Sequence, residues 1–488
     1  MGFRKEGIAV LAFKSEVAMI KHEVLREVAR LALAEQLRDQ VDRLPRAFTD
    51  SGITHYRCCV YKERAILAQR IKLALGFSPH EVDPETRLSE VVDAYYAGHQ
   101  IVAPVIDIIE EACDRCPIDR YMVTDACRGC VAHFCVNACP KKAISIMGRR
   151  AYIDQEQCVE CGRCSRACHL HAIVEVMRPC ERSCPTGAIK PGPNRNSVID
   201  KGLCTSCGAC VAACPFGAIS DKSQLVDVIQ WVKAGERVVA AFAPALVGQF
   251  GPRVDMGQVL ATLKQLGFAA TAEVAYGADQ VARQEAEEFG RRVAETGWLA
   301  SSCCPAFVAF IRKHYPDLVD HISKTPSPMV MLARHLKKQD PNIRVVFIGP
   351  CVAKKEEALA PGSGVDAALT FTEVAAWMDA MGSDPAKITV PVEPDQVASP
   401  WGRGFAVSGG VAAALKAALE GQGTEVGFKP VLANGLEECK RYLTLAQAGK
   451  LPGNFLEGMA CVGGCVGGPA ALVEAAHGAR AVERFKCA

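Results

Sequence analysis

The chain has 488 residues, which is too long for a single hydrophobic core, so we expect two or three domains. Hydrophobic residues make up 50% and the formal net charge is +2, a balance that suggests neither a nucleic-acid nor a strongly acidic partner. No apolar run reaches the length of about 18 residues that a membrane span needs, and the first residues lack a signal-peptide pattern. We therefore expect a cytoplasmic protein.

Residues 1–105 predict a helical N-terminal region. Apolar side chains recur at helical spacing between residues 17 and 31, and Ser15 is a candidate N-cap. A second helical pattern covers residues 62–75. We interpret this region as a helical cap or docking surface.

The cysteines of the next region, residues 106–222, indicate metal ligation. Of the 25 cysteines in the chain, 16 fall between Cys113 and Cys214 at spacings of two or three residues. Disulfide scaffolds are usually small secreted domains with evenly spread cysteines, whereas tight spacing is typical of metal ligands. Zinc is the competing metal, but zinc sites pair two C-x2-C units, and here a third cysteine follows within the same loop.

Three cysteine runs follow the spacing C-x2-C-x2-C-x3-C-P of bacterial ferredoxins or vary it slightly, and they predict an α+β ferredoxin-like domain with [4Fe–4S] clusters. The third run keeps the spacing in full and ends in Pro215, the second ends in His169, and the first has a wider middle gap. The runs are Cys127, Cys130, Cys135, Cys139; Cys158, Cys161, Cys164, Cys168; and Cys204, Cys207, Cys210, Cys214.

Four cysteines of this region remain: Cys113, Cys116, Cys180 and Cys184. They read as one run that is interrupted by a complete two-cluster ferredoxin, which the first two runs above would form. That nesting resembles multi-cluster ferredoxin subunits of larger redox enzymes. It predicts four clusters, with ligand sets Cys127, Cys130, Cys135, Cys168; Cys158, Cys161, Cys164, Cys139; Cys113, Cys116, Cys180, Cys214; and Cys204, Cys207, Cys210, Cys184. The alternative for Cys113 and Cys116 is a pair of ordinary buried thiols.

Residues 226–488 alternate strand-like runs with amphipathic helices, which predicts α/β layers with parallel strands. Ligands in such folds bind at the carboxyl ends of the strands. The expected strands are RVVAAFAPA at 237–245, IRVVFIGP at 343–350 and RGFAVSGG at 403–410, and the expected helices are MGQVLATLKQLGF at 256–268 and GGVAAALKAALEG at 409–421.

Three further cysteine segments are far apart in this region: SSCCPAF at 301–307, IGPCVAKKEE at 348–357 and EGMACVGGCVGG at 457–468. In this order they resemble the signature segments of [FeFe]-hydrogenases, TSCCP, PC-x-x-K-K and E-x-M-A-C-x-x-G-C-x-x-G-G, and are most similar to the group B branch. The resemblance implies a two-lobed α/β hydrogenase large-subunit-like domain. It also implies an H-cluster, in which a [4Fe–4S] cluster is joined to a di-iron subsite carrying CO, cyanide and a dithiolate.

By this resemblance, the [4Fe–4S] part of the H-cluster is held by Cys304, Cys351, Cys461 and Cys465, and Cys465 also bridges to the di-iron subsite. Lys354 is expected to donate a hydrogen bond to a cyanide, Met459 to pack against the subsite, and Pro244 and Pro350 to line the pocket. From the residues alone, Lys354 reads equally well as a solvated lysine of the KKEE run.

Cys303 is not needed as a ligand, and the resemblance gives it a role in passing protons to the subsite. The relay is expected to continue through Glu285, Glu288, Ser323 and Arg292 to the surface. Glu285 and Glu288 are three residues apart and therefore share one helix face. The alternative is an exposed helix face with a Glu288–Arg292 pair.

The resemblance implies a ferredoxin hydrogenase, an enzyme that reversibly reduces protons to H2. Ferredoxin would be its electron partner, and maturation enzymes would supply the di-iron subsite. Two alternatives stay open: a non-catalytic iron–sulfur assembly or electron-transfer homologue, and a hydrogen sensor. Four thiols remain unassigned: Cys58, Cys59, Cys439 and Cys487. We favour a structural role for Cys58 and Cys59, and a redox or metal site is the alternative.

Overall fold

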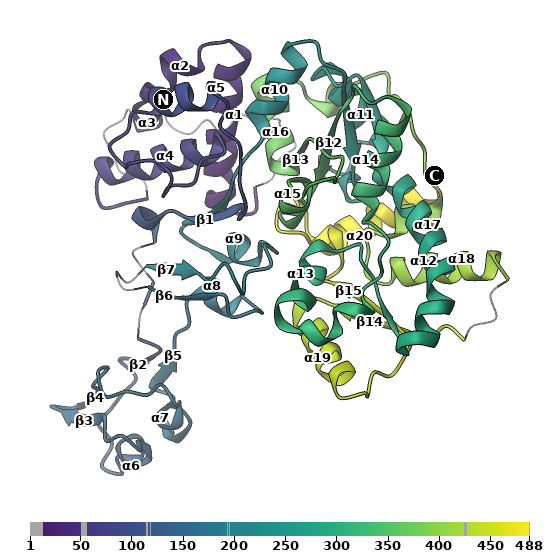
Figure 1. Cartoon of the computed structure of the whole chain (residues 1–488). Helices are drawn as coiled ribbons and strands as arrows, with labels where there is room; N and C mark the ends of the chain where they lie inside the picture. Colours follow the sequence, from purple (N-terminus) through teal and green to yellow (C-terminus); the bar gives the residue numbers. More distant parts are fainter. Residues whose placement is uncertain are drawn as a thin grey trace.

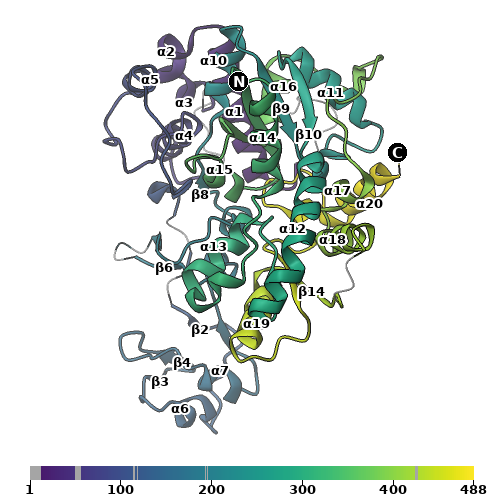
Figure 2. The same ribbon diagram turned by 45° about the vertical axis from the view of Figure 1, so that its right-hand side comes forward.

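The structure is a computed structural model that describes residues 13–49, 56–113, 116–117, 119–192, 194, 196–423 and 427–487. Figures 1 and 2 show a helical N-terminal part and a larger C-terminal part side by side, with a small lobe that projects away from both. Among the described residues, no helix has the length and apolar character that crossing a membrane requires.

The N-terminal part is helical, as predicted. Ser15 caps the first helix and accepts a hydrogen bond from the amide of Ala18, so the expected N-cap is confirmed. The helices are α1 (Glu16–Leu33), α2 (Leu37–Gln40), α3 (Leu44–Ala47), α4 (Val60–Ala74) and α5 (Leu88–Tyr96).

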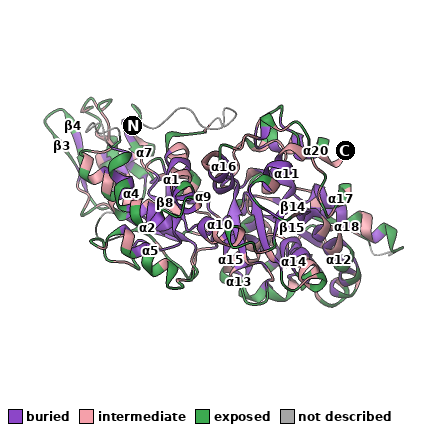
Figure 3. Ribbon diagram, turned by 90° about the horizontal axis from the view of Figure 1, so that it is seen from above, coloured by how far each residue is buried: buried purple, intermediate pink, exposed green. Residues whose placement is uncertain are grey.

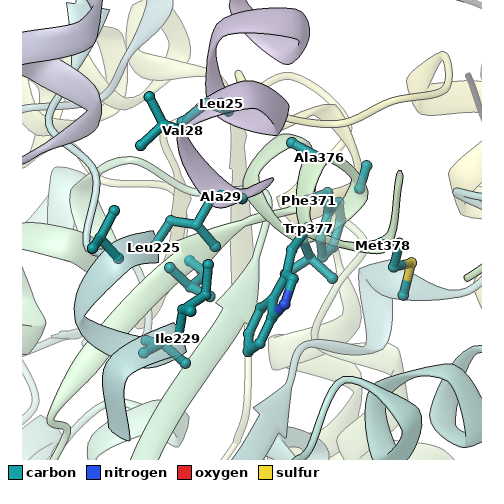
Figure 4. Packing of buried hydrophobic residues seen from close by; sticks show 14 of the residues in the cluster. Leu25, Val28, Ala29, Leu225, Ile229, Phe371, Ala376, Trp377 and Met378 are labelled. Atoms are coloured by element: carbon teal, nitrogen blue, oxygen red, sulfur yellow. The ribbon is translucent and has the colours of Figure 1, made fainter. Parts of the chain in front are cut away.

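Helix α1 packs against the C-terminal part of the chain. Its apolar stripe, which includes Val28 and Ala29, contacts α10 (Leu225–Lys233) and α16 (Phe371–Ala380). Figure 4 shows these side chains around Trp377, which is fully buried. The helical part is therefore joined to the larger part through a continuous hydrophobic core.

The cysteine-rich region folds into nested pairs of short antiparallel strands. The pairs are β1 (Ile106–Ile108) with β8 (Ile219–Asp221), β2 (Tyr121–Val123) with β5 (Ile173–Glu175), β3 (Ile144–Met147) with β4 (Arg150–Ile153), and β6 (Ile189–Pro191) with β7 (Ser197–Ile199). Since the β2–β5 pair lies in sequence between β1 and β8, residues 121–175 form an inserted unit, and this unit is the projecting lobe in Figures 1 and 2.

A one-turn or two-turn helix lies inside or beside each cysteine run of this region. These helices are α6 (Phe134–Ala138), α7 (Arg163–Ala167), α8 (Pro179–Arg182) and α9 (Ala209–Ala213).

The first sheet of the C-terminal part has four parallel strands in the order β10-β9-β12-β13, with bounds β9 (Val238–Phe242), β10 (Ala270–Glu273), β12 (Arg344–Gly349) and β13 (Ala367–Thr370). Val238, Ala240 and Phe242 belong to the core shared with α10, α11 (Met256–Gln265) and α16. Val239 and Ala241 face the core shared with α14 (Pro328–Gln339). Both faces of this sheet are thus covered. Figure 3 shows that buried residues gather in the interior of the C-terminal part.

The second sheet has three parallel strands in the order β11-β15-β14, with bounds β11 (Leu299–Ala300), β14 (Pro430–Asn434) and β15 (Phe455–Met459). One face packs on α13 (Pro305–His314) and α19 (Leu436–Gln447). The other packs on α12 (Val274–Thr296) and α18 (Gly410–Gly421). Two parallel sheets therefore form two lobes, and α12 contacts both.

The prediction of a strand at 403–410 is wrong. Residues up to 404 belong to α17 (Pro400–Gly404), and a turn then leads directly into α18. The turn brings Gly410 so close to Gly404 that a Cβ at position 410 would lie 1.9 Å from the Gly404 carbonyl oxygen. The side chain of Arg403 forms a bidentate ion pair with Glu273, the last residue of β10.

Candidate active site

Four cysteines of the C-terminal part follow three parallel strands. Cys304 caps α13 after β11, Cys351 comes directly after β12, and Cys461 and Cys465 follow β15. Since the carboxyl ends of parallel strands share one edge, the two sheets bring these three loops together between the lobes.

The four thiols are close enough to perturb one another. Burial raises the pKa of Cys461 well above its usual range, and Cys351, Cys304 and Cys465 raise it further. Burial, followed by Cys304 and Cys465, likewise raises the pKa of Cys351 to about 12. A set of enclosed thiolates is unfavourable without a cation, so this donor set fits a metal centre.

The sulfur donors are not arranged for a single ion. Among the residues that the structure describes, no group of three or more His, Cys, Asp or Glu side chains could hold one metal ion. Four neighbouring thiols at wider spacing suit the corners of a cluster, and the residues present therefore fit the cubane part of an H-cluster.

Lys354 is buried beside this site and is not a solvated lysine. Its side chain is 8% exposed, and Nζ donates to Glu357 at 2.6 Å and to Ser327 Oγ at 2.9 Å. Burial acts to lower the pKa of Lys354, but Glu357 and then the thiols of Cys351 and Cys303 outweigh it and raise the pKa. Lys354 therefore carries a stable positive charge next to the cysteines.

The other expected pocket residues also lie at this edge. Met459 ends β15 and belongs to the same hydrophobic cluster as Cys303 and Cys304. Pro244 is buried at the start of the short turn after β9, and the carbonyl of Pro350 accepts the amide of Ala470 at 3.1 Å.

Cys303 lies between the four cysteines and a buried carboxylate. Burial raises the pKa of the Cys303 thiol well above its usual range, and the charges of Cys304, Glu285, Glu457 and Cys465 add to this. The thiol therefore lies near both the cysteine site and Glu285, and its raised pKa favours the protonated form.

Glu285 begins a row of buried polar side chains that belong to α12 and to the segment around Ser323. Glu285 is fully buried, and burial raises its pKa to about 7 although hydrogen bonds from Ser323 and Ser302 oppose the shift. Ser323 Oγ donates to Glu288 at 3.0 Å, and Glu288 pairs with Arg292 at 3.6 Å. The pair expected for an exposed helix face is present, but both of its residues are buried.

The comparisons with known proteins assign this region. A model of the iron-only hydrogenase large subunit, C-terminal domain, matches residues 236–469. The periplasmic [Fe] hydrogenase large subunit of Nitratidesulfovibrio vulgaris is 31% identical over 372 residues, which cover 65% of this chain and 85% of that protein. The chain belongs to the iron-only hydrogenase family.

Other relatives match less of their own length. Iron hydrogenase 1 of Clostridium pasteurianum is 29% identical over 65% of this chain, and the match covers 64% of that protein. A cytosolic Fe–S cluster assembly factor of Kluyveromyces lactis is 31% identical over 110 residues, 22% of this chain and 18% of that protein. Among solved structures, an apo [FeFe]-hydrogenase from Chlamydomonas reinhardtii aligns with 24% identity and a TM-score of 0.43 over 51% of this chain and 84% of that one.

Two models of iron–sulfur domains match the cysteine-rich region. A 4Fe–4S dicluster domain matches residues 126–172, and a 4Fe–4S binding domain matches residues 197–220. With the hydrogenase family, these matches give the cofactors of the chain as the H-cluster and [4Fe–4S] clusters.

In the projecting lobe, the cysteines that perturb one another belong to the same predicted ligand set. We call these sets interlaced, because each takes its fourth cysteine from the other run. Apart from burial, the pKa of Cys135 is raised by Cys168 and Cys130, and that of Cys164 by Cys158 and Cys139. In each case a cysteine from the end of the other run completes the group. This arrangement supports the two ligand sets that are predicted from the runs at 127–139 and 158–168, which we call the inner sets.

The other two predicted ligand sets, the outer sets, also group cysteines that perturb one another. They take their cysteines from the interrupted run at 113–184 and from the run at 204–214. Burial raises the pKa of Cys116 to about 11, with further contributions from Cys180, Cys113 and Cys214. The pKa of Cys210 is raised by burial and then by its neighbours Cys207, Cys204, Cys184 and Cys180. Cys113 and Cys116 are therefore grouped with other thiols, which disfavours the reading of two ordinary buried cysteines.

The loop of the last ferredoxin run touches the active-site loops. Cys207 is one of the charges that raise the pKa of Cys461. Gly208 packs so closely that a Cβ there would lie 2.6 Å from Pro469 and 3.2 Å from Val352. Ser206 also donates a hydrogen bond to Glu356. This contact joins the last cluster loop to the H-cluster site.

Three residues of the site were missed from the sequence. Ser302 donates to the Thr325 carbonyl and lies 3.4 Å from Glu285, and Ser327 and Glu357 hold Lys354. Glu357 could have been found, since it is three residues after Lys354 on one helix face. Ser327 carried no signal, because only the tertiary fold brings it close.

The unassigned cysteines divide into two kinds. Cys439 is fully buried in α19, as expected of a structural thiol. Cys58 and Cys59 are exposed where α4 begins, and Cys487 is exposed after α20 (Ala475–Lys486). The reading of Cys58 and Cys59 as structural thiols is therefore wrong, because both are exposed and belong to no hydrophobic cluster of the described residues.

Proposed function

We propose that the chain catalyses the reversible reduction of protons to H2, with electrons from ferredoxin or a similar low-potential carrier. The position of Cys303 carries the proposal. Four cysteines alone could hold a cubane in an electron carrier, but Cys303 adds a protonated thiol that faces both those cysteines and Glu285. A redox centre with a proton donor at its side is what proton reduction requires.

In this proposal Cys304, Cys351, Cys461 and Cys465 hold the [4Fe–4S] part of the H-cluster, and Cys465 also binds the di-iron unit. When bound, that unit, installed by maturation enzymes, supplies the metal position at which protons and H2 interconvert. Lys354 presents a positive charge to the anionic cyanide ligands, held in place by Glu357 and Ser327. Met459, Pro244 and Pro350 enclose the pocket and exclude water.

Protons would reach Cys303 through the buried chain in α12. Arg292 and Glu288 form its outer end, Ser323 lies between the two carboxylates, and Glu285 is next to Cys303. A carboxyl with a pKa of about 7 both accepts and releases a proton near neutral pH, which suits a relay that works in both directions.

Electrons would enter at the projecting lobe and pass inward through four [4Fe–4S] clusters. The lobe carries the two inner sets farthest from the C-terminal part, and the loop of Cys204, Cys207 and Cys210 contacts the active-site loops. The physical order of the clusters thus runs from an exposed lobe to the buried site.

Infrared spectroscopy tests the proposal on protein purified without oxygen from cells that contain the maturation enzymes. Bands of bound CO and cyanide are expected. Cys303→Ala should keep those bands and lose H2 turnover, whereas Cys487→Ala, an exposed thiol far along the chain, should change neither. If the bands are absent and only cubane signals appear in EPR, the chain is an electron-transfer or assembly homologue and the proposal fails.

A further inference from the structure

Arg70 joins the helical N-terminal part to the turn that follows Cys214. It lies on α4, and its guanidinium donates to the carbonyl oxygens of Phe216 at 3.4 Å and Gly217 at 3.1 Å. Gly217 has a φ of +58°, and a Cβ there would lie 2.6 Å from a terminal nitrogen of Arg70. The turn accepts the guanidinium only because residue 217 has no side chain.

The charge of Arg70 has no carboxylate partner within the described part of the chain. Its Nε is buried without a hydrogen-bond partner. Glu16 and Glu63 line the same cavity of about 160 Å³, and one oxygen of each accepts a hydrogen bond from Tyr56. The other oxygen of Glu63, Oε2, is buried without a hydrogen-bond partner, and Arg70 forms no ion pair with either carboxylate. A buried cation is costly unless an opposite charge lies nearby, so a negative charge is expected close to Arg70.

The neighbouring charges indicate where that negative charge is. Burial, and then repulsion from Arg57, lower the pKa of Arg70 to about 10, whereas Cys214 acts in the opposite direction. Cys214 in turn is grouped with Cys116 and Cys180. The attractive neighbour of Arg70 is therefore a proposed cluster ligand.

We propose that Arg70 is a positioning residue that supplies a counter-charge to the [4Fe–4S] cluster held by Cys113, Cys116, Cys180 and Cys214, and so raises the reduction potential of that cluster. A fixed positive charge favours the reduced form, which carries one more negative charge. The inference rests on the proposed cluster relay and deepens it. It makes the helical N-terminal part a component of electron transfer, because α4 carries the charge that sets the potential of one cluster.

EPR-monitored redox titration of the full chain with its clusters tests this inference. Arg70→Gln should move the midpoint of one cluster to lower potential by about 59 mV, which for a one-electron couple is a tenfold change in the ratio of oxidised to reduced cluster. Arg64→Gln is the matched control. It removes the same charge from the same helix, but its Nε donates to Thr49 at 2.7 Å, so all midpoints should stay unchanged.

Arg70→Lys separates the effect of the charge from that of the guanidinium geometry, since it keeps the positive charge and removes the planar guanidinium group. Its midpoints should match those of the unaltered protein. Unchanged midpoints in Arg70→Gln, or an equal shift in Arg70→Lys, would overturn the inference. Loss of one cluster from Arg70→Gln alone supports the counter-charge, whereas its loss from both variants refutes it. Absence of the CO and cyanide bands would defeat the proposed activity but leave this titration valid, because it observes the [4Fe–4S] clusters.

Discussion

The ammonium group of Lys354 donates a hydrogen bond to the carbonyl oxygen of Cys303 at 3.3 Å. The lysine belongs to α15 (Ala353–Ala358), the helix that follows β12 in one lobe, and the cysteine to the loop after β11 in the other. This contact ties together the cation and the extra thiol, the two groups that distinguish the site from a plain cubane site.

Lys354→Met should lower the retention of the di-iron unit while the [4Fe–4S] clusters remain. The change removes the cation that faces the cyanide ligands and leaves Glu357 without its partner. The ratio of CO and cyanide band intensity to total iron measures the effect, and we expect a loss of about tenfold or more. Lys338→Met alters an exposed lysine of α14 and serves as the control. Full band intensity in Lys354→Met would show that the cation does not retain the unit.

Glu285→Gln should reduce H2 turnover by about 10²- to 10⁴-fold, because the amide cannot relay a proton. Burial raises the pKa of Glu285 to about 7, so an infrared band of a protonated carboxyl should titrate with that midpoint and be absent from Glu285→Gln. The raised pKa means that this group stabilises the fold below its ordinary pKa of 4.5, and the contribution is lost as the pH rises through about 7. A band that persists in the variant belongs to another group.

Ser323→Ala should slow turnover by about tenfold or more without altering the cluster spectra. The hydroxyl lies between the two carboxylates of α12, and its loss interrupts the chain at its middle. Ser363→Ala is the control, since Ser363 is also buried but bonds to Ala358 outside the relay. Equal rates in both serine variants would place the proton route elsewhere.

Cys168→Ser and Cys139→Ser test the interlaced ligand sets. Cys168 follows Cys164 in sequence, yet its neighbour in space is Cys135. Cys168→Ser should therefore perturb the cluster held by Cys127, Cys130 and Cys135, and Cys139→Ser the other cluster of the lobe. Each single variant should change the EPR signal of one cluster. The double variant should change the signals of both clusters of the lobe. Identical spectra of the two single variants would contradict the interlaced arrangement.

Lys355→Met should lower the free energy of unfolding by about 3–5 kcal/mol. The ammonium lies 2.7 Å from Asp221 and 2.9 Å from Glu373, and all three are buried where the ferredoxin-like and C-terminal parts meet. The variant leaves both carboxylates short of a cation. The thermal midpoint measures the loss, with the exposed Lys338→Met as control. An unchanged midpoint would mean that Lys21, which also pairs with Asp221, is sufficient.

Acid should weaken the same junction. Burial acts to raise the pKa of Asp221, but Lys21 and Lys355 outweigh it and hold the pKa below the ordinary value of 3.8. The stabilisation from this carboxylate is therefore present above pH 3.8 and is lost as the pH falls through the lower pKa.

The sequence by itself predicted the ligand groups, because close cysteine spacing within one loop allows three sulfurs to surround one cluster. It also determined the α/β layering, since β9 and β12 are short apolar runs between amphipathic helices. It misassigned residues 403–410, because the run of four residues between Gly404 and Gly409 is compatible with a strand and with a turn between two helices.

Only the tertiary structure decided which polar residues are buried. The sequence EAEEFGRR fits an exposed helix face, and Glu285 became an interior acid only because the loops after β11 and around Ser323 cover α12. Lys354 likewise reads as a solvated lysine in the sequence, but in the structure other elements pack over it. Spacing along the chain fixes which side chains share a helix face, but the environment of that face depends on elements far away in sequence.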